Sequence, residues 1–176
     1  MDKLQDTIRY DAQQVLELQR LVMKGEGQSL EFKRKASHPE KIVREMVAFA
    51  NSGGGTLLIG VGDDGSIPGV RYPEDESYVI HKALQYCTPL LNITETFIAV
   101  GNQHMVIQYT IHESDCKPHS LRTPDNTIET YVRTHDKSIK ASREMREIIK
   151  RTGAQKDIKF FYGEHERTLM QYLNDN

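Results

Sequence analysis

The apolar run from Thr56 to Val61 constrains the fold of this chain more than any other segment. Its residues, T-L-L-I-G-V, do not alternate between apolar and polar side chains, as those of a half-exposed strand would. A near-continuous apolar strand is typical of a sheet that is covered on both faces. The run therefore predicts a central strand between two layers of structure, and it is far too short to cross a bilayer.

Helices and strands are predicted on the amino-terminal side of this run. Apolar residues at helical spacing predict an amphipathic helix, and Leu30 and Phe32 alternate with charged residues as in a strand. A second helix begins at Pro39 and ends in residues that tolerate positive φ. The predicted segments are a helix over 4–23, a strand over 29–34, a helix from Pro39 to Ala50 and its terminator Asn51-Ser52-Gly53-Gly54-Gly55.

The segments after the central strand are predicted in the same way. Asp63-Asp64-Gly65 favours a tight turn into a short strand around Ile67, and Ser142 has the residue type of a helix N-cap. The remaining elements are a helix over 77–86, a hairpin of strands 93–100 and 104–111 joined at 101–103, a loop over 117–126, a strand over 127–133 and a basic helix from Ser142 to Arg151, ended by Gly153. A linker, an aromatic cluster at 160–162 and a helix with Leu169, Met170 and Leu173 are expected last.

These elements predict an α+β fold in which helices pack a mixed β-sheet, with extra helices at both ends. The 176 residues, 38% hydrophobic and 27% charged, suit one core with appendages. We expect an amino-terminal helix over 1–23, one domain over 24–152, and a carboxy-terminal linker and helix over 153–176.

A reducing compartment suits the two cysteines. Cys87 and Cys116 lie in different segments without CxxC spacing, which indicates neither a disulfide framework nor a zinc site. The amino terminus has no apolar stretch of the kind found in secretory signals. We therefore expect a cytoplasmic protein.

Positive charge is concentrated late in the chain, although the net charge is only −2. From Arg133 to Arg151, seven basic residues face three acidic ones. Arg143, Arg146 and Lys150 are spaced to share one helical face that could follow a phosphate backbone; the alternative is a solvated face partly neutralised by neighbouring glutamates. The candidate nucleic-acid-binding residues are Lys33, Arg34, Lys35, Arg133, Lys137, Lys140, Arg143, Arg146 and Lys150.

Four carboxylates form a candidate metal site. Glu26 and Glu31 flank the entry into the first strand, and Asp63 and Asp64 follow the central strand. If the two strands are neighbours, these oxygens can converge on Mg²⁺ or Mn²⁺, and such a cation could assist phosphodiester cleavage. The alternatives are that Glu31 lies on a solvated face and that the aspartates only form a turn.

The glycine run before the central strand is predicted to end a helix. Phosphate-binding loops connect a strand to a helix, and here the order is reversed. Asn51 remains a weak candidate for hydrogen bonding near a site. The seven histidines lack HxxxH spacing, and no GxSxG motif is present, so zinc hydrolysis and acyl transfer have little support.

Three stretches in fixed order resemble one known family. They are GEGQSLEFKR at 25–34, AFANSGGGTLLIGVGDDGSIPGV at 48–70 and IETYVRTHDKSIKASREM at 128–145. Together they resemble the Schlafen-type, Alba-like domain (second Alba class) over roughly residues 24–151. The loop from Thr134 to Ser138 departs from the small residue and Gly-Ser that are usual there.

The resemblance implies the fold predicted above and a nucleic-acid partner, with a homodimer as the expected assembly. We favour a module that binds DNA or RNA, as in a bacterial transcriptional regulator. The first alternative is a metal-dependent endoribonuclease in which Glu26, Glu31 and Asp63 are catalytic and Lys33 or Arg133 steadies the phosphate. The second is a nucleotide-sensing or assembly domain.

Overall fold

The computed structural model describes residues 2–101 and 103–153, and their side chains from residue 12 to residue 151. The predicted carboxy-terminal linker, aromatic cluster and last helix lie outside the described residues. No helix within the described ranges is long and apolar enough to span a membrane.

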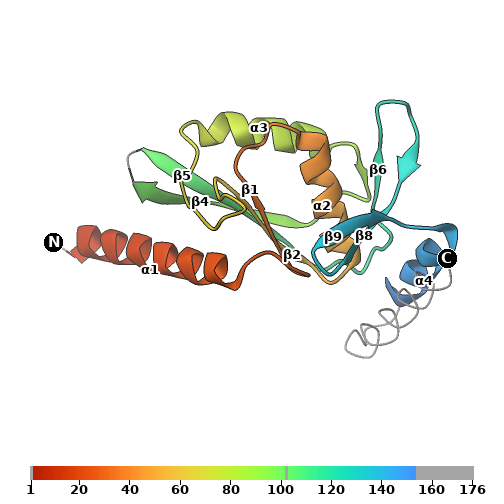
Figure 1. Cartoon of the computed structure of the whole chain (residues 1–176), viewed down its shortest axis with the longest axis horizontal. Coiled ribbons are helices and arrows are strands. Elements are labelled where there is room, and N and C mark those ends of the chain that lie inside the picture. Colours follow the sequence, from red (N-terminus) through yellow and green to blue (C-terminus); the bar gives the residue numbers. More distant parts are fainter. Residues whose placement is uncertain (1, 102, 154–176) are drawn as a thin grey trace.

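A four-stranded mixed sheet forms the centre of the fold (Figure 1). Its strands are β1 (Leu30–Lys33), β2 (Gly55–Ile59), β4 (Ile93–Gly101) and β5 (His104–Ile111), in the order β1-β2-β5-β4. β1 and β2 run parallel, whereas β5 is antiparallel to both β2 and β4. The predicted α+β class with a mixed sheet is confirmed, and so is the predicted hairpin of β4 and β5.

Helices cover both faces of this sheet, as the apolar run predicted. Leu57 and Ile59 of β2 point toward α2 (Pro39–Asn51) and α3 (Pro73–Leu84). Leu58, between them, points to the other face, where Leu18 and Val22 of α1 (Asp2–Lys24) pack on it. All three β2 side chains are fully buried, because the alternation of a strand sends neighbouring residues into opposite layers.

Two smaller sheets and a last helix extend the core at one end. β3 (Cys87–Thr88), β6 (Ser120–Arg122) and β7 (Ile128–Glu129) form one sheet, and β8 (Tyr131–Thr134) pairs with β9 (Lys137–Lys140) in a hairpin. α4 (Arg143–Gly153) packs on this hairpin through Met145 and Ile149, which meet Val132 and Ala141. Figure 1 shows α4 beside β8 and β9, at the opposite end of the molecule from the start of α1.

Two predicted strands differ from the structure. The segment around Ile67 is not a strand: it returns over Gly60, whose missing Cβ would lie 2.9 Å from Gly69, and forms only a bridge from Val70 to Met105. The predicted strand over 127–133 is two strands in different sheets, because β7 pairs with β6 whereas β8 pairs with β9. β6 lies inside the predicted loop over 117–126.

Candidate nucleic-acid interface

The basic side of α4 is held outward by its apolar side. Ser142 caps the helix as predicted, since its hydroxyl accepts a hydrogen bond from the Met145 amide at 3.2 Å. Burial of Met145 and Ile149 fixes the rotation of the helix. Arg143 and Lys150 are consequently exposed, and Arg146 is half-buried.

The hairpin under α4 adds one lysine to this surface. Lys137 and Ile139 share a face of β9, and Ile139 packs against the apolar side of α4. Lys140 alternates to the other face, where it contacts Glu129 at 2.6 Å. The basic platform, as we use the term, consists of Lys137, Arg143, Arg146 and Lys150.

The pair formed by Lys140 and Glu129 is a local structural contact. Two hydrogen bonds lower the pKa of Glu129: the larger effect comes from Lys140 and the smaller from the Tyr131 hydroxyl. Burial raises the pKa of the Tyr131 hydroxyl to about 12. Lys140 therefore belongs to a satisfied pair on the side of the hairpin away from the platform.

Arg34 and Lys35 lie at a separate place, just after β1. The Lys33 carbonyl accepts a hydrogen bond from the Gly60 amide at 2.7 Å, which puts Arg34 beside the turn that follows β2. In that turn, Asp64 accepts hydrogen bonds from the Ser66 hydroxyl and amide. These hydrogen bonds lower the pKa of Asp64, and the charge of Arg34 makes a smaller contribution in the same direction. The basic residues that the sequence groups together thus form two sites.

Arg133 is buried rather than displayed. Its side chain has no exposed surface, and its guanidinium lies 4.8 Å from the centre of the Phe49 ring. The guanidinium contacts Glu31 at 2.6 Å and Glu45 at 2.7 Å, and it donates to the Gly27 carbonyl at 2.9 Å. Arg133 therefore joins β1, α2 and β8 in the interior, where a phosphate does not reach it.

Glu31 is the main partner of this arginine. It points away from Leu30 and Phe32, into the interior between β1 and α2, so it is not on a solvated face. One carboxylate oxygen contacts Arg133 and the other contacts the Lys33 ammonium group. Lys33 and Arg133, which the sequence analysis offered as phosphate contacts, therefore both neutralise Glu31.

Glu45 belongs to the same cluster and was missed from the sequence. Its carboxylate accepts hydrogen bonds from Arg133 and from the Ser138 hydroxyl of β9. The available signal was its position on the predicted helix, because Glu45 lies one turn from Ile42 and Phe49 on the apolar side. A charged residue on such a stripe indicates a buried ionic partner.

The carboxylates predicted to hold a metal are not brought together. Glu31 faces Leu57 in the β-register, six residues before Asp63, and Asp63 and Asp64 are exposed in the turn. Glu26 accepts a hydrogen bond from the Phe32 amide at 2.8 Å. Within residues 12–101 and 103–151, no three His, Cys, Asp or Glu side chains are placed to hold a metal ion. Binding of Mg²⁺ or Mn²⁺ at these carboxylates therefore stays a prediction.

Asn51 connects the end of α2 to two distant segments. Its amide oxygen accepts from the His119 amide at 2.7 Å, and its amide nitrogen donates to the carbonyls of His119 and Tyr131 at 2.9 and 2.8 Å. Ser52 then accepts a hydrogen bond from the Arg133 amide. The helix terminator predicted from sequence is therefore also the anchor of β8.

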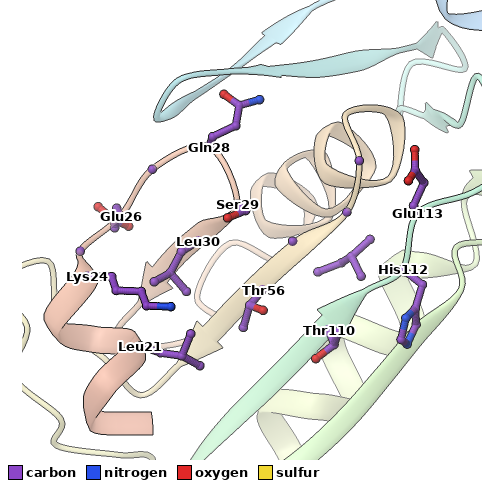
Figure 2. A pocket seen from close by; sticks show the side chains of 16 residues that line it. Leu21, Lys24, Glu26, Gln28, Ser29, Leu30, Thr56, Thr110, His112 and Glu113 are labelled. Carbon is purple, nitrogen blue, oxygen red and sulfur yellow. The ribbon is translucent and has the colours of Figure 1, made fainter. Parts of the chain in front are cut away.

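A pocket of about 550 Å³ opens where β1 and β2 begin, between the end of α1 and the end of β5 (Figure 2). Glycines at 25, 27 and 53–55 form much of its wall. Figure 2 shows Thr56 and Thr110 on neighbouring strands, with Leu21 and Lys24 on one side and His112 and Glu113 on the other. Of the predicted site residues, only Glu26 lines this pocket.

A comparison with protein-family models supports the resemblance that the sequence motifs indicate. The family model described as "Schlafen, AlbA_2" matches residues 26–157, which is most of the chain. The chain belongs to the Schlafen AlbA_2 family. The match begins in the loop with the sequence GEGQS (residues 25–29), which we call the GEGQS loop. It includes Arg133 with its partners Glu31 and Glu45, and the basic platform. No curated protein matches the sequence as an individual relative.

Membership in the Schlafen AlbA_2 family indicates a nucleic-acid-related domain. Within this Schlafen AlbA_2 domain, the motif residues Glu31 and Arg133 form the interior cluster, whereas the segment after them carries the exposed cations of the platform.

Proposed function

We propose that this chain binds nucleic acid through the basic platform of α4 and β9. The observation that carries the proposal is the anchoring of α4: its apolar side is buried on β8 and β9, so its cations are presented on a fixed surface. Ordered cations of this kind contact phosphates and position a protein on the backbone. Arg34 and Lys35 offer a second site, weakened by the neighbouring Asp64.

Charge reversal on the platform tests this proposal. Fluorescence anisotropy would compare DNA and RNA strands binding to the wild type and to the Arg143→Glu/Lys150→Glu double variant at several salt concentrations. We expect at least a tenfold loss of affinity and a log–log salt slope that is shallower by about two, because two phosphate contacts are removed.

A control with the same change in net charge separates local contact from global attraction. Arg71→Glu/Lys82→Glu reverses two cations beside and within α3, which Figure 1 shows on the other side of the molecule from α4. This variant should keep most of the affinity. If both double variants bind like the wild type, the platform is a solvated surface and the proposal is wrong.

The ribonuclease alternative is tested with the same strands. Cleavage that requires Mn²⁺ or Mg²⁺ and stops with a chelator would favour it, and Glu26→Gln would then remove cleavage while retaining binding. Glu26 suits this test better than Glu31, because its carboxylate is exposed at the pocket and does not neutralise Arg133. A sensing or assembly role would instead give binding to neither polymer.

The expected homodimer remains a prediction. Leu16 and Met23 of α1 are exposed large apolar side chains, and a second copy could cover them. Sedimentation of the wild type and of the Leu16→Glu variant tests this: a dimer that uses α1 would dissociate in the variant.

A further inference from the structure

We infer that the pocket between α1, the GEGQS loop and the end of β5 accepts one unpaired nucleobase. This inference rests on the proposed nucleic-acid binding and specifies which part of the polymer the pocket would take. Its volume of about 550 Å³ lies within the range of small-ligand sites and suits one heterocycle.

Gly27 is a glycine of the pocket wall that the backbone does not require. Among the five glycines of the pocket wall, Gly25, Gly53 and Gly54 have φ values between +75° and +98°, and a Cβ on Gly55 would lie 2.4 Å from the Phe49 ring. Gly27 has neither requirement: its φ is outside the left-handed region, and a Cβ there would meet no heavy atom within 4 Å. The fold therefore leaves space beside Gly27 on the pocket wall, where a substituted side chain can be introduced as a probe.

The charges of the pocket disfavour a phosphate. Lys24 is the one lysine or arginine of its lining, and the carboxylate of Glu26 opposes it. The other carboxylate of the lining, Glu113, is paired with Lys117 at 2.9 Å, so the pocket has little net positive charge. An anionic group would therefore gain little here, whereas the basic platform is suited to it.

The chemistry of the lining fits a heterocyclic base. Leu21 and Leu30 provide an apolar wall for a ring face. Thr56 and Thr110 are directly paired on β2 and β5, so two hydroxyls lie next to each other on the pocket floor. Hydroxyls both donate and accept, which matches the mixed donors and acceptors along the edge of a base.

The pocket is tied to the hairpin that carries the platform. Gln28 lines the pocket and donates a hydrogen bond to the Arg133 carbonyl at 3.3 Å, while the Gly27 carbonyl accepts from the Arg133 guanidinium. β8 then leads through the hairpin turn to Lys137. A base can enter such a pocket only when it is unstacked and not held in a duplex, so the inference applies to single strands.

An abasic strand separates the two contacts. It retains every phosphate and lacks the bases, so its affinity reports on the platform alone. Anisotropy would compare a short single strand with the abasic strand of equal length, for the wild type and for Gly27→Leu, which adds a large side chain at the pocket wall. Gln85→Leu adds the same side chain at the exposed C-cap position after α3 and serves as the matched control.

We expect the wild type and Gln85→Leu to bind the intact strand at least tenfold more tightly than the abasic strand, and Gly27→Leu to bind both equally. If Gly27→Leu does not fold, Thr110→Val should still reduce the preference by roughly threefold to tenfold through loss of one hydroxyl. Equal binding of the two strands by the wild type would overturn the pocket inference alone. Binding of neither strand would overturn the proposed function as well.

Discussion

The guanidinium of Arg133 lies 2.6 Å from a carboxylate oxygen of Glu31, although the two residues are 102 positions apart in the chain. The same guanidinium lies 2.7 Å from Glu45 and stacks on Phe49. No surface of the Arg133 side chain is exposed. This pair links the first strand of the main sheet to the hairpin that carries the basic platform.

Replacing Arg133 by methionine should strongly destabilise the protein. Glu31 and Glu45 would lose the cation that they share in the interior, and breaking such a pair costs about 3–5 kcal/mol. Urea denaturation would measure the loss. Arg143→Met, on the exposed side of α4, should change the free energy of unfolding by no more than about 0.5 kcal/mol. Equal stability of the two variants would contradict a structural role for Arg133.

The Asn51→Ala variant should lose about 2–4 kcal/mol of stability. Three backbone groups of His119 and Tyr131 lose their hydrogen-bond partner in a buried place, and each unsatisfied group is costly. Thermal or urea unfolding would measure the change. Asn92→Ala removes the same amide at an exposed position and should be nearly neutral; a similar loss there would show that the effect is not specific to the Asn51 bonds.

His119 should make stability sensitive to acid. Burial lowers the pKa of its ring below the ordinary 6.5, although a hydrogen bond to the Pro89 carbonyl opposes the shift. Its Nε2 is buried and has no partner among the described residues. As pH falls, the His119 ring is therefore protonated in the unfolded chain before it is protonated in the folded protein. The contribution of neutral His119 to stability is complete above pH 6.5 and is lost as pH falls below that value.

The measurement is the free energy of unfolding as a function of pH. The His119 contribution should fall by at most about 1.4 kcal/mol per pH unit below 6.5. His119→Gln should be less stable at neutral pH, and its deficit relative to the wild type should shrink on acidification. A constant deficit from pH 7.5 to 5 would contradict this assignment.

Two glycines of the pocket wall should respond oppositely to alanine. A Cβ on Gly54 would lie 2.7 Å from the Ile111 carbonyl, and its φ of +84° is strained for alanine, so Gly54→Ala should cost more than about 1 kcal/mol. Gly27→Ala meets no atom and should be neutral or slightly stabilising. Melting temperatures of the two variants test this, and a destabilised Gly27→Ala would contradict the open space beside Gly27.

Local patterns in the sequence predicted the framework of the fold. The apolar run identified the strand that is buried on both faces, the Gly101-Asn102-Gln103 segment identified the hairpin of β4 and β5, and Ser142 identified the start of α4. Each of these depends on residues that are close in the chain. By contrast, β3, β6 and β7 have two or three residues each, too few to show a period.

The candidate site was less predictable because its contacts are distant in sequence. Nothing in the segment Tyr131–Thr134 indicates that Arg133 will contact Glu31. Arg133 was therefore predicted to contact phosphate, although its side chain is buried. Glu31 and Asp63 do lie near the same two strands, as expected, but strand alternation and register separate their side chains. The exposed cations of α4 were predictable because helical spacing alone places them.

The contacts of Glu31 with Arg133 and Lys33 have a consequence for mutational work on this domain. A glutamate that neutralises an enclosed arginine is required for assembly of the hairpin even if it never meets a ligand. A variant such as Glu31→Gln that loses activity would thus resemble an enzyme deprived of its acid or base while being only partly folded. Urea unfolding of Glu31→Gln beside the wild type would separate these two explanations, because loss of chemistry alone leaves the free energy of unfolding unchanged.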